Sequence, residues 1–112
     1  MLLRRGDIVL ADFTPARAGE ANYIRPAIVV TNNEANALAP VVVVIPLTSN
    51  VAKIYPMQLF LPSEKTGLDR DSKAQVELIR HISLERVQKV LSYLPDEFML
   101  RLDERIREHL AL

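Results

Sequence analysis

The most constraining feature of this sequence is an unbroken run of five β-branched residues, Val41 to Ile45, near the middle of the chain. Valine and isoleucine favour a pleated strand because branching at Cβ is crowded in a helix and tolerated in a sheet. A run without polar alternation indicates a strand that is covered on both faces. A shorter apolar run, Ala27 to Val30, precedes it. The two runs therefore predict a β fold with these strands at its centre.

A proline and a polar residue border each of the two runs. Pro26 restricts Arg25 to an extended conformation at the start of its strand, and Pro46 is expected to end ladder pairing because proline has no N–H. Thr48 follows just beyond. Two polar side chains at the ends of two stiff strands form a plausible reactive pair. On spacing alone, the more common interpretation is a surface ion pair for Arg25 and a local turn hydrogen bond for Thr48.

The rest of the chain predicts further short strands and one helix. The strands are expected at residues 7–13, 54–61, 73–80 and 88–94, with a short helix capped by Thr31 or Asn32 and a turn capped by Ser83. Pro95 starts a terminal helix whose apolar residues recur every four positions. The predicted fold is a single mainly β domain, residues 1–112, in which five to six strands form a small barrel with a C-terminal helix.

Composition narrows the possible functions. The sequence has no cysteine, so disulfides and thiolate metal sites are excluded. Its 14 basic and 14 acidic residues balance, which argues against coating nucleic acid by charge alone but permits a local basic groove. No apolar run is long enough to span a bilayer, and the N-terminus lacks an apolar signal core. We therefore expect a cytoplasmic protein that makes no membrane contact.

Two polar loops are candidate sites. Residues 16–24 form a long connection between strands, and such connections are often functional, although a merely solvated loop has the same composition. The loop at 62–71 contains Asp69 and Asp71. Without further clustered ligands, this second loop is more typical of a charged surface than of a metal site.

Several segments together resemble the MazF/PemK/Kid family of toxins from bacterial toxin–antitoxin pairs. They are RGDIVLADFTP, IRPAIVV, TNNEAN, VVVVIPLTS, TGLDRDSKA and IRHISLERV, in this order and over nearly the whole chain. The resemblance implies an SH3-like barrel that forms a homodimer and binds a cognate antitoxin. It also implies sequence-specific endoribonuclease activity on single-stranded RNA (mRNA) that needs no metal or other cofactor.

The same resemblance assigns roles to residues. The catalytic arginine before the proline corresponds to Arg25, and the threonine of the PLT segment to Thr48. The acidic residue of the first loop corresponds to Glu20, and an acid on the fifth strand to Glu77. The expected RNA contacts lie in the first loop and beside the catalytic residues: Arg17, Asn22, Tyr23, Ser49 and Gln75.

The chain departs from the family pattern at two positions. Tyr23 stands where the family commonly has glycine, which is expected to stiffen the loop and to add a ring for base stacking. Leu78 stands where many members have glutamine. The general base is left open between Glu77 and Glu20. A non-catalytic toxin of the same fold, acting by protein binding as gyrase poisons do, is the alternative function.

Overall fold

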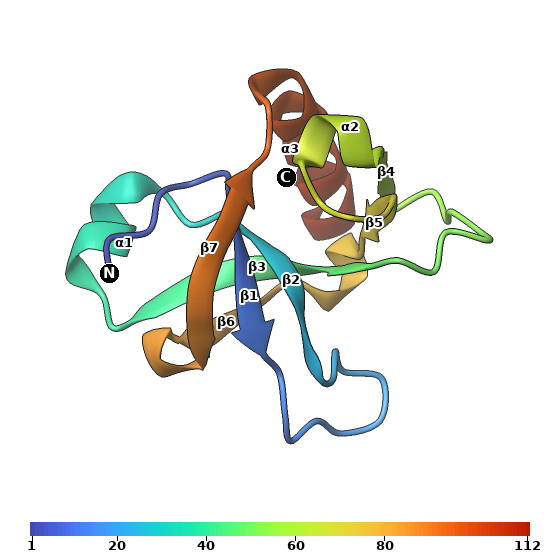
Figure 1. Cartoon of the computed structure of the whole chain (residues 1–112). Coiled ribbons are helices and arrows are strands. Elements are labelled where there is room, and N and C mark those ends of the chain that lie inside the picture. Colours follow the sequence, from blue (N-terminus) through green and yellow to red (C-terminus); the bar gives the residue numbers. More distant parts are fainter.

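The computed structural model describes all 112 residues, which fold into seven strands, three α-helices and two 3-10 helices (Figure 1). In chain order the elements are β1 (Asp7–Asp12), β2 (Ile24–Val29), α1 (Asn33–Leu38), β3 (Val41–Thr48), β4 (Leu59–Leu61), α2 (Ser63–Thr66), β5 (Ser72–Ala74), η1 (Val76–Leu78), β6 (Arg80–Ser83), η2 (Leu84–Arg86), β7 (Val87–Tyr93) and α3 (Asp96–Leu110). The prediction of a mainly β domain with a C-terminal helix is confirmed.

All strand pairs are antiparallel, and the order across the sheet is β4-β5-β3-β2-β1-β7, with β6 also paired to β3. The outer strands β4 and β7 do not pair with each other, so the sheet is open and the expected barrel is not confirmed. The sheet has seven strands, where five to six were predicted. The segment predicted as one strand at 73–80 instead holds the end of β5, the helix η1 and the first residue of β6, and β6 continues to Ser83 as the additional strand.

The central strand β3 runs through Pro46 to Thr48, so the strand does not end at this proline. On the β2 edge the pairing does end there, as predicted, because Ala27 opposite Pro46 is the last pair. On the other edge the pairing is interrupted between Val44, opposite Arg80, and Leu47, opposite Ala74, and then continues with β5 to Thr48. Within this break the Pro46 carbonyl accepts a hydrogen bond from the Gln75 amide at 2.9 Å, because proline lacks only the donor.

The helix η1 fills this break and explains why residues 73–80 do not form one strand. The Leu78 and Ile79 amides donate to the Gln75 and Val76 carbonyls, which closes a tight turn between β5 and β6. The predicted strand at 54–61 is also shorter than expected. Its first residues form a turn in which the Gln58 amide donates to the Tyr55 carbonyl, and only Leu59–Leu61 pair with β5.

Both faces of the central strand β3 are covered, as the valine run predicted. Alternate residues of β3 belong to two separate core clusters, with Val42 and Val44 in one and Ile45 and Leu47 in the other. The cluster that contains Ile45 also includes Phe98, Met99 and Leu102 of α3, so this helix covers one face. The second cluster includes residues of the loop between β1 and β2, which covers the opposite face.

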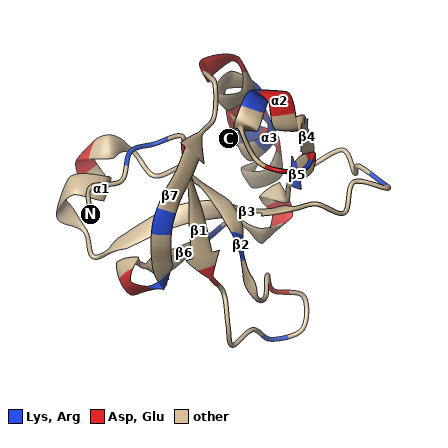
Figure 2. Cartoon of the chain, in the orientation of Figure 1, with Lys and Arg blue, Asp and Glu red and all other residues tan.

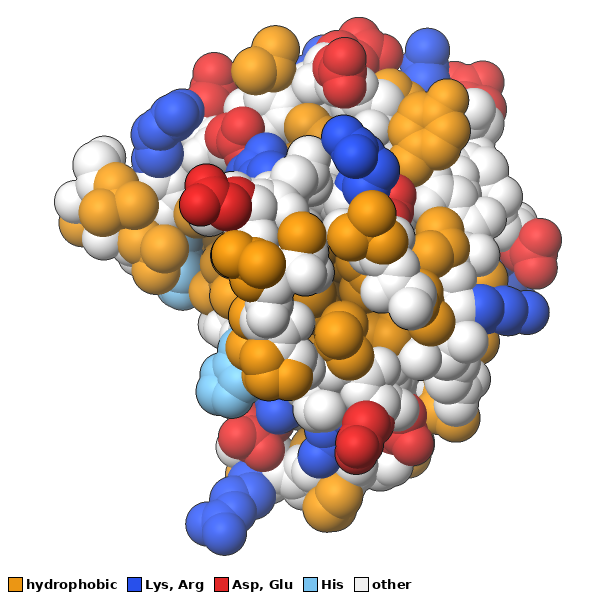
Figure 3. Space-filling view, turned by 90° about the vertical axis from the view of Figure 1, so that its left-hand side faces the viewer, with side chains coloured by type: hydrophobic (Ala, Val, Ile, Leu, Met, Phe, Trp, Pro, Cys, Tyr) orange, Lys and Arg blue, Asp and Glu red, His pale blue; other side chains and the backbone are white.

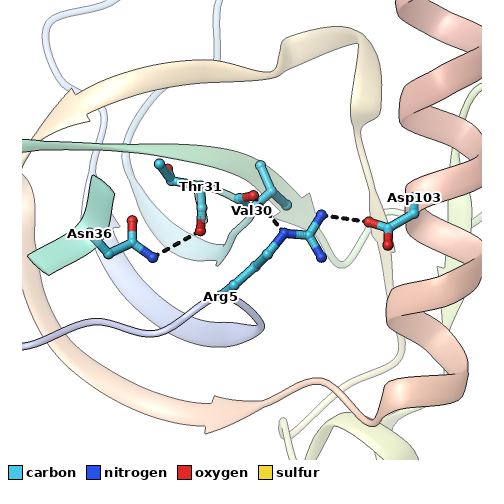
Figure 4. A network of polar contacts seen from close by, with 5 residues as sticks. All are labelled: Arg5, Val30, Thr31, Asn36 and Asp103. Carbon is cyan, nitrogen blue, oxygen red and sulfur yellow. Dashed lines mark hydrogen bonds and ion pairs between the residues drawn. The ribbon is translucent and has the colours of Figure 1, made fainter. Parts of the chain in front are cut away.

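A polar network ties α3 to the N-terminal segment and to the end of β2 (Figure 4). The Arg5 guanidinium donates to the Asp103 carboxylate of α3 at 2.5 Å and to the Val30 carbonyl at 2.8 Å. Nearby, the Asn36 amide of α1 donates to the Thr31 carbonyl at 2.9 Å. The cap of α1 is Asn32, whose side chain accepts from the Ala35 amide. The network fixes the helix orientation beyond what apolar packing provides.

Apolar side chains also lie on the surface. Figure 3 shows a face on which a central group of apolar side chains is bordered by acidic and basic ones. The edge strand β7 exposes Val90, Leu91 and Tyr93. None of the helices combines the length and the apolar composition that a bilayer crossing requires.

Candidate active site

One cleft of about 570 Å³ brings together four of the predicted site residues. Tyr23 and Arg25 enter it from the start of β2, and Thr48 and Ser49 from the end of β3. These positions are neighbours because β2 and β3 are adjacent antiparallel strands, so the start of one lies beside the end of the other. The pairing inferred from two strand ends is therefore present in the structure as one cleft.

Arg25 is half-buried at the wall of this cleft. Its Nη1 donates to Oε1 of Gln75 at 3.3 Å, so Gln75 orients the guanidinium from the loop after β5. A guanidinium has five N–H donors in a planar fork, and this single hydrogen bond leaves most of them free. Arg25 is therefore held in place while it can still bind a phosphate through two donors.

Thr48 is half-buried on the same cleft, at the last residue of β3. Its Oγ1 accepts a hydrogen bond from the Asn50 amide at 3.2 Å. Because the hydroxyl acts as an acceptor in this contact, its own hydrogen is free to be donated. Thr48 thus presents a donor to the cleft beside the Arg25 guanidinium.

The two predicted catalytic glutamates line a different pocket of about 390 Å³, which shares no lining residue with the cleft. Glu20 is exposed, and its Oε1 accepts from the Arg17 amide at 2.7 Å, which closes a turn of the β1–β2 loop. Glu77 is half-buried, and its Oε2 accepts from Gln58 Nε2 at 2.7 Å, while its Oε1 is buried without a hydrogen bond. Arg80 and His81 line the same pocket.

The remaining predicted RNA contacts do not line the cleft; they are Arg17, Asn22 and Gln75. Asn22 instead accepts a hydrogen bond from the Tyr23 amide at 2.8 Å. Asp69 and Arg70 also reach the cleft, from the loop after α2. Their segment, TGLDRDSKA, is among those that carry the family resemblance, but the sequence indicated only a charged surface loop there.

The start of the β1–β2 loop is anchored to the body of the protein. Arg86 Nη1 donates to the Asp12 and Thr14 carbonyls at 3.1 and 2.6 Å. The Thr14 hydroxyl and amide both donate to the Asp12 carboxylate, and these bonds hold the pKa of Asp12 below its ordinary value, with a smaller contribution from the Arg86 charge. The loop that carries Glu20 and Tyr23 therefore begins at a fixed point.

Comparison with known proteins identifies the family. Residues 4–110 match the model of the PemK-like, MazF-like toxins of type II toxin–antitoxin systems. The chain belongs to this family. It is 45% identical to the endoribonuclease MazF9 of Mycobacterium tuberculosis, over 99% of this chain and 98% of that protein. It is 32% identical to the endoribonuclease EndoA of Bacillus subtilis, over 100% of this chain and 97% of that protein.

Solved structures of MazF proteins share the fold of this PemK/MazF-family chain. MazF from Deinococcus radiodurans superposes with a TM-score of 0.88 at 22% identity, covering 100% of this chain and 99% of the other. A mycobacterial endoribonuclease in complex with its cognate antitoxin superposes with a TM-score of 0.79 at 16% identity, over 99% of this chain and 95% of that one. At these identities, the likeness shows the fold alone.

Tyr23 occupies a backbone conformation that glycine adopts more easily than other residues. Its φ angle is 67°, in the left-handed region that glycine enters without a steric penalty. The Tyr23 carbonyl is fixed by the Phe13 amide at 3.0 Å. The side chain is 67% exposed, so the ring stands at the cleft without being packed into the core.

No group of three histidine, aspartate or glutamate side chains comes together in a way that would hold a metal ion. Figure 2 shows acidic and basic segments interspersed along the chain. The charge at the cleft is not balanced, because its lining includes two basic residues, Arg25 and Arg70, and one acidic residue, Asp69. The cleft therefore suits an anionic ligand.

Proposed function

We propose that this PemK/MazF-family chain is a sequence-specific endoribonuclease that cleaves single-stranded RNA without a metal ion, as the toxin of a toxin–antitoxin pair. The observation that most directly supports this proposal is that Arg25 and Thr48, from two different strands, line one cleft. Relatives that align over nearly the full chain are named endoribonucleases, which supports the same activity.

In the proposed reaction, the ribose 2′-hydroxyl attacks the adjacent phosphorus and the 5′-oxygen of the next nucleotide leaves. Arg25 binds the non-bridging phosphate oxygens, where negative charge develops in the transition state. The free hydroxyl hydrogen of Thr48 donates to the same phosphate. Arg70 on the cleft adds a second positive charge near the RNA backbone.

The general base that we favour is Glu77. Its side chain lines the second pocket and its Oε1 is buried without a hydrogen bond, so RNA binding must bring this oxygen into contact with the 2′-hydroxyl before it can accept the proton. Glu20 is the second candidate, but it is exposed and engaged with the Arg17 amide. Either assignment requires the scissile phosphate and its ribose to lie between the cleft and the second pocket, within reach of both Arg25 and the carboxylate.

We further propose that the chain acts in the cytoplasm as a homodimer that a cognate antitoxin binds. A mycobacterial structural neighbour is described in complex with its antitoxin. The edge strand β7 carries exposed apolar side chains at Val90 and Tyr93, which a symmetric partner would cover. Light scattering at micromolar concentration is expected to give a dimeric mass, and a monomeric mass contradicts this part of the proposal.

The test of the activity is incubation of the purified protein with RNA, followed by mapping of the cleaved bonds. We expect cleavage at a defined sequence by the wild type and none by Arg25→Ala or Thr48→Ala, both of which should keep the fold because neither residue belongs to a core cluster. Intact RNA with the wild type would instead favour the alternative in which the toxin acts by protein binding. Full activity of either folded variant would remove that residue from the mechanism.

A further inference from the structure

A second positively charged surface lies beside the cleft, in the loop that follows Thr48. It consists of Lys53 and Tyr55 in this loop and Lys73 on β5, and none of the three lines the cleft or the second pocket. Figure 2 shows a basic segment in this loop, which extends away from the body of the protein. None of the three ion pairs in the structure includes Lys53 or Lys73.

Lys73 is the unusual member of this surface, because it is a lysine with only 7% of its surface exposed. Its Nζ donates to the Lys53 carbonyl at 2.7 Å. An ammonium has three donors, so two remain after this contact. A buried positive charge without a counter-ion is costly, and an anion that accepts from the remaining donors would offset this cost.

An aromatic ring lies next to the two ammonium groups. The Lys53 and Lys73 nitrogens are 4.7 and 5.7 Å from the centroid of the Tyr55 ring, within the range of cation–π contacts. The tyrosine remains 46% exposed. The surface therefore offers two positive charges and an accessible aromatic ring together.

Strand pairing places this surface next to the proposed catalytic residues. Thr48 lies directly opposite Lys73 in the β3–β5 pair, and Leu47 lies opposite Ala74. Leu47 and Ala74 are in the core, so Thr48 and Lys73 point together to the other face. The residue before Lys73, Ser72, lines the cleft itself.

A hydrogen-bond chain holds the loop in this position. Glu77 accepts from Gln58 Nε2 at 2.7 Å, and Gln58 Oε1 accepts from the Tyr55 amide at 3.1 Å. Gln58 is itself buried. The backbone at Tyr55 is thus fixed relative to the sheet, so a ligand that stacks on the ring does not first have to order the loop.

We propose that Lys53, Tyr55 and Lys73 form a nucleotide-binding platform for the RNA strand just outside the cleft. The two lysines bind a backbone phosphate and the Tyr55 ring stacks on the neighbouring base, a combination typical of single-strand binding surfaces. An acidic peptide would satisfy the lysines but would make no use of the ring. The proposal rests on the proposed ribonuclease function, and it adds a contact that extends the bound RNA beyond the scissile phosphate.

The test measures the affinity for single-stranded oligonucleotides of increasing length. Each carries a 2′-O-methyl group at the cleavage site mapped for the wild type, and each is extended by one nucleotide at a time in both directions. We expect one extension to raise the wild-type affinity about 5- to 150-fold, the effect of one stacked base. Tyr55→Leu and Lys73→Met should lose this gain.

Salt dependence gives a second measurement. Removing one phosphate contact to a single strand lowers the slope of log K against log salt by about 0.7, so Lys73→Met and Lys53→Gln should each show this decrease with the extended oligonucleotide. Lys65→Gln is the matched control. Lys65 forms an ion pair with Glu97 of α3, with 3.8 Å between the nitrogen and the carboxylate oxygen, so its substitution should leave the salt slope unchanged. If the buried substitution at Lys73 prevents folding, the exposed positions Lys53 and Tyr55 provide the same test.

The outcomes separate this proposal from the proposed function. If the wild type does not cleave RNA, the ribonuclease function fails and the platform fails with it. If the wild type cleaves RNA and the folded variants keep both the extension gain and the salt slope, only the platform is overturned. Variants that bind RNA normally but bind poly-glutamate less tightly than the wild type would overturn the platform in favour of a protein-binding surface.

Discussion

Replacing Tyr23 by glycine is expected to raise stability and weaken RNA binding at the same time. The tyrosine has a φ angle of 67° and its side chain is 67% exposed. A non-glycine residue in this left-handed region carries a cost of about 1–2 kcal/mol. Glycine removes this cost. However, its unfolded chain has more conformational freedom, which lowers the free energy of unfolding by about 0.4–1 kcal/mol. Since little packing is lost, the net gain in unfolding free energy is about 0.5–1 kcal/mol.

The magnitudes can be measured separately. In a chain of this length, about 1 kcal/mol corresponds to about 4 °C, so Tyr23→Gly should raise Tm by about 2–4 °C. The lost ring should weaken binding of a non-cleavable RNA by about 1–3 kcal/mol, or about 5- to 150-fold. Differential scanning calorimetry measures the first change, and a fluorescence anisotropy titration measures the second.

Two further variants distinguish the ring from the backbone. Tyr23→Ala loses the ring but keeps a side chain at the strained position, so it should bind as weakly as the glycine variant without the gain in Tm. Tyr23→Phe keeps the ring and should retain the affinity. Unchanged RNA affinity of both the glycine and the alanine variants would refute the stacking role. A lower Tm of the glycine variant would refute the argument from strain.

Three other predictions concern the cleft and the loop that leads to it. Arg25→Lys should lower the cleavage rate about 10²- to 10³-fold, because an ammonium cannot reproduce the planar fork, while Tm changes little; cleavage within twofold of the wild type would contradict this. Cleavage should persist in excess chelator, and activity that is lost there and restored by magnesium would refute the metal-free mechanism. Asp12→Asn should lower Tm at pH 7, because the pKa of Asp12 is depressed in the folded protein, so its carboxylate stabilises the fold above the unfolded pKa. The difference in Tm between the wild type and the variant should vanish as the pH falls through the pKa of folded Asp12, which lies below 3.8. An equal difference in Tm at pH 7 and at low pH would contradict the role of Asp12 in anchoring the loop.

The position of Glu77 connects the two proposals. Its two carboxylate oxygens have different surroundings, since Oε2 binds Gln58 and Oε1 has no hydrogen bond. Oε2 positions the Tyr55 loop through Gln58, and Oε1 is the oxygen that we propose as the base once RNA is bound. A Glu77 substitution therefore affects both the chemistry and the platform, which is why the platform is tested at Lys53, Tyr55 and Lys73 instead.

The sequence by itself determined the central strands and the terminal helix, and through the family resemblance it named Arg25 and Thr48. The valine run specifies a strand buried on both sides by local preference alone, and Pro95 followed by acidic residues specifies the start of α3. Spacing alone favoured local contacts for Arg25 and Thr48, and the order of several matched segments was needed to join them as one site. A structural feature that depends on the residues of one short segment can be predicted without knowing how the rest of the chain folds.

Only the tertiary structure decided where the other site residues lie. The break between β5 and β6 depends on how β3 pairs along its whole length, which no local pattern in residues 73–80 records. The same turn carries Glu77 away from the cleft and toward Gln58, and the left-handed end of α2 at Gly67 brings Arg70 into it. These placements depend on contacts between residues far apart in the chain, so the sequence could name Glu77 as a candidate but could not determine which pocket it lines.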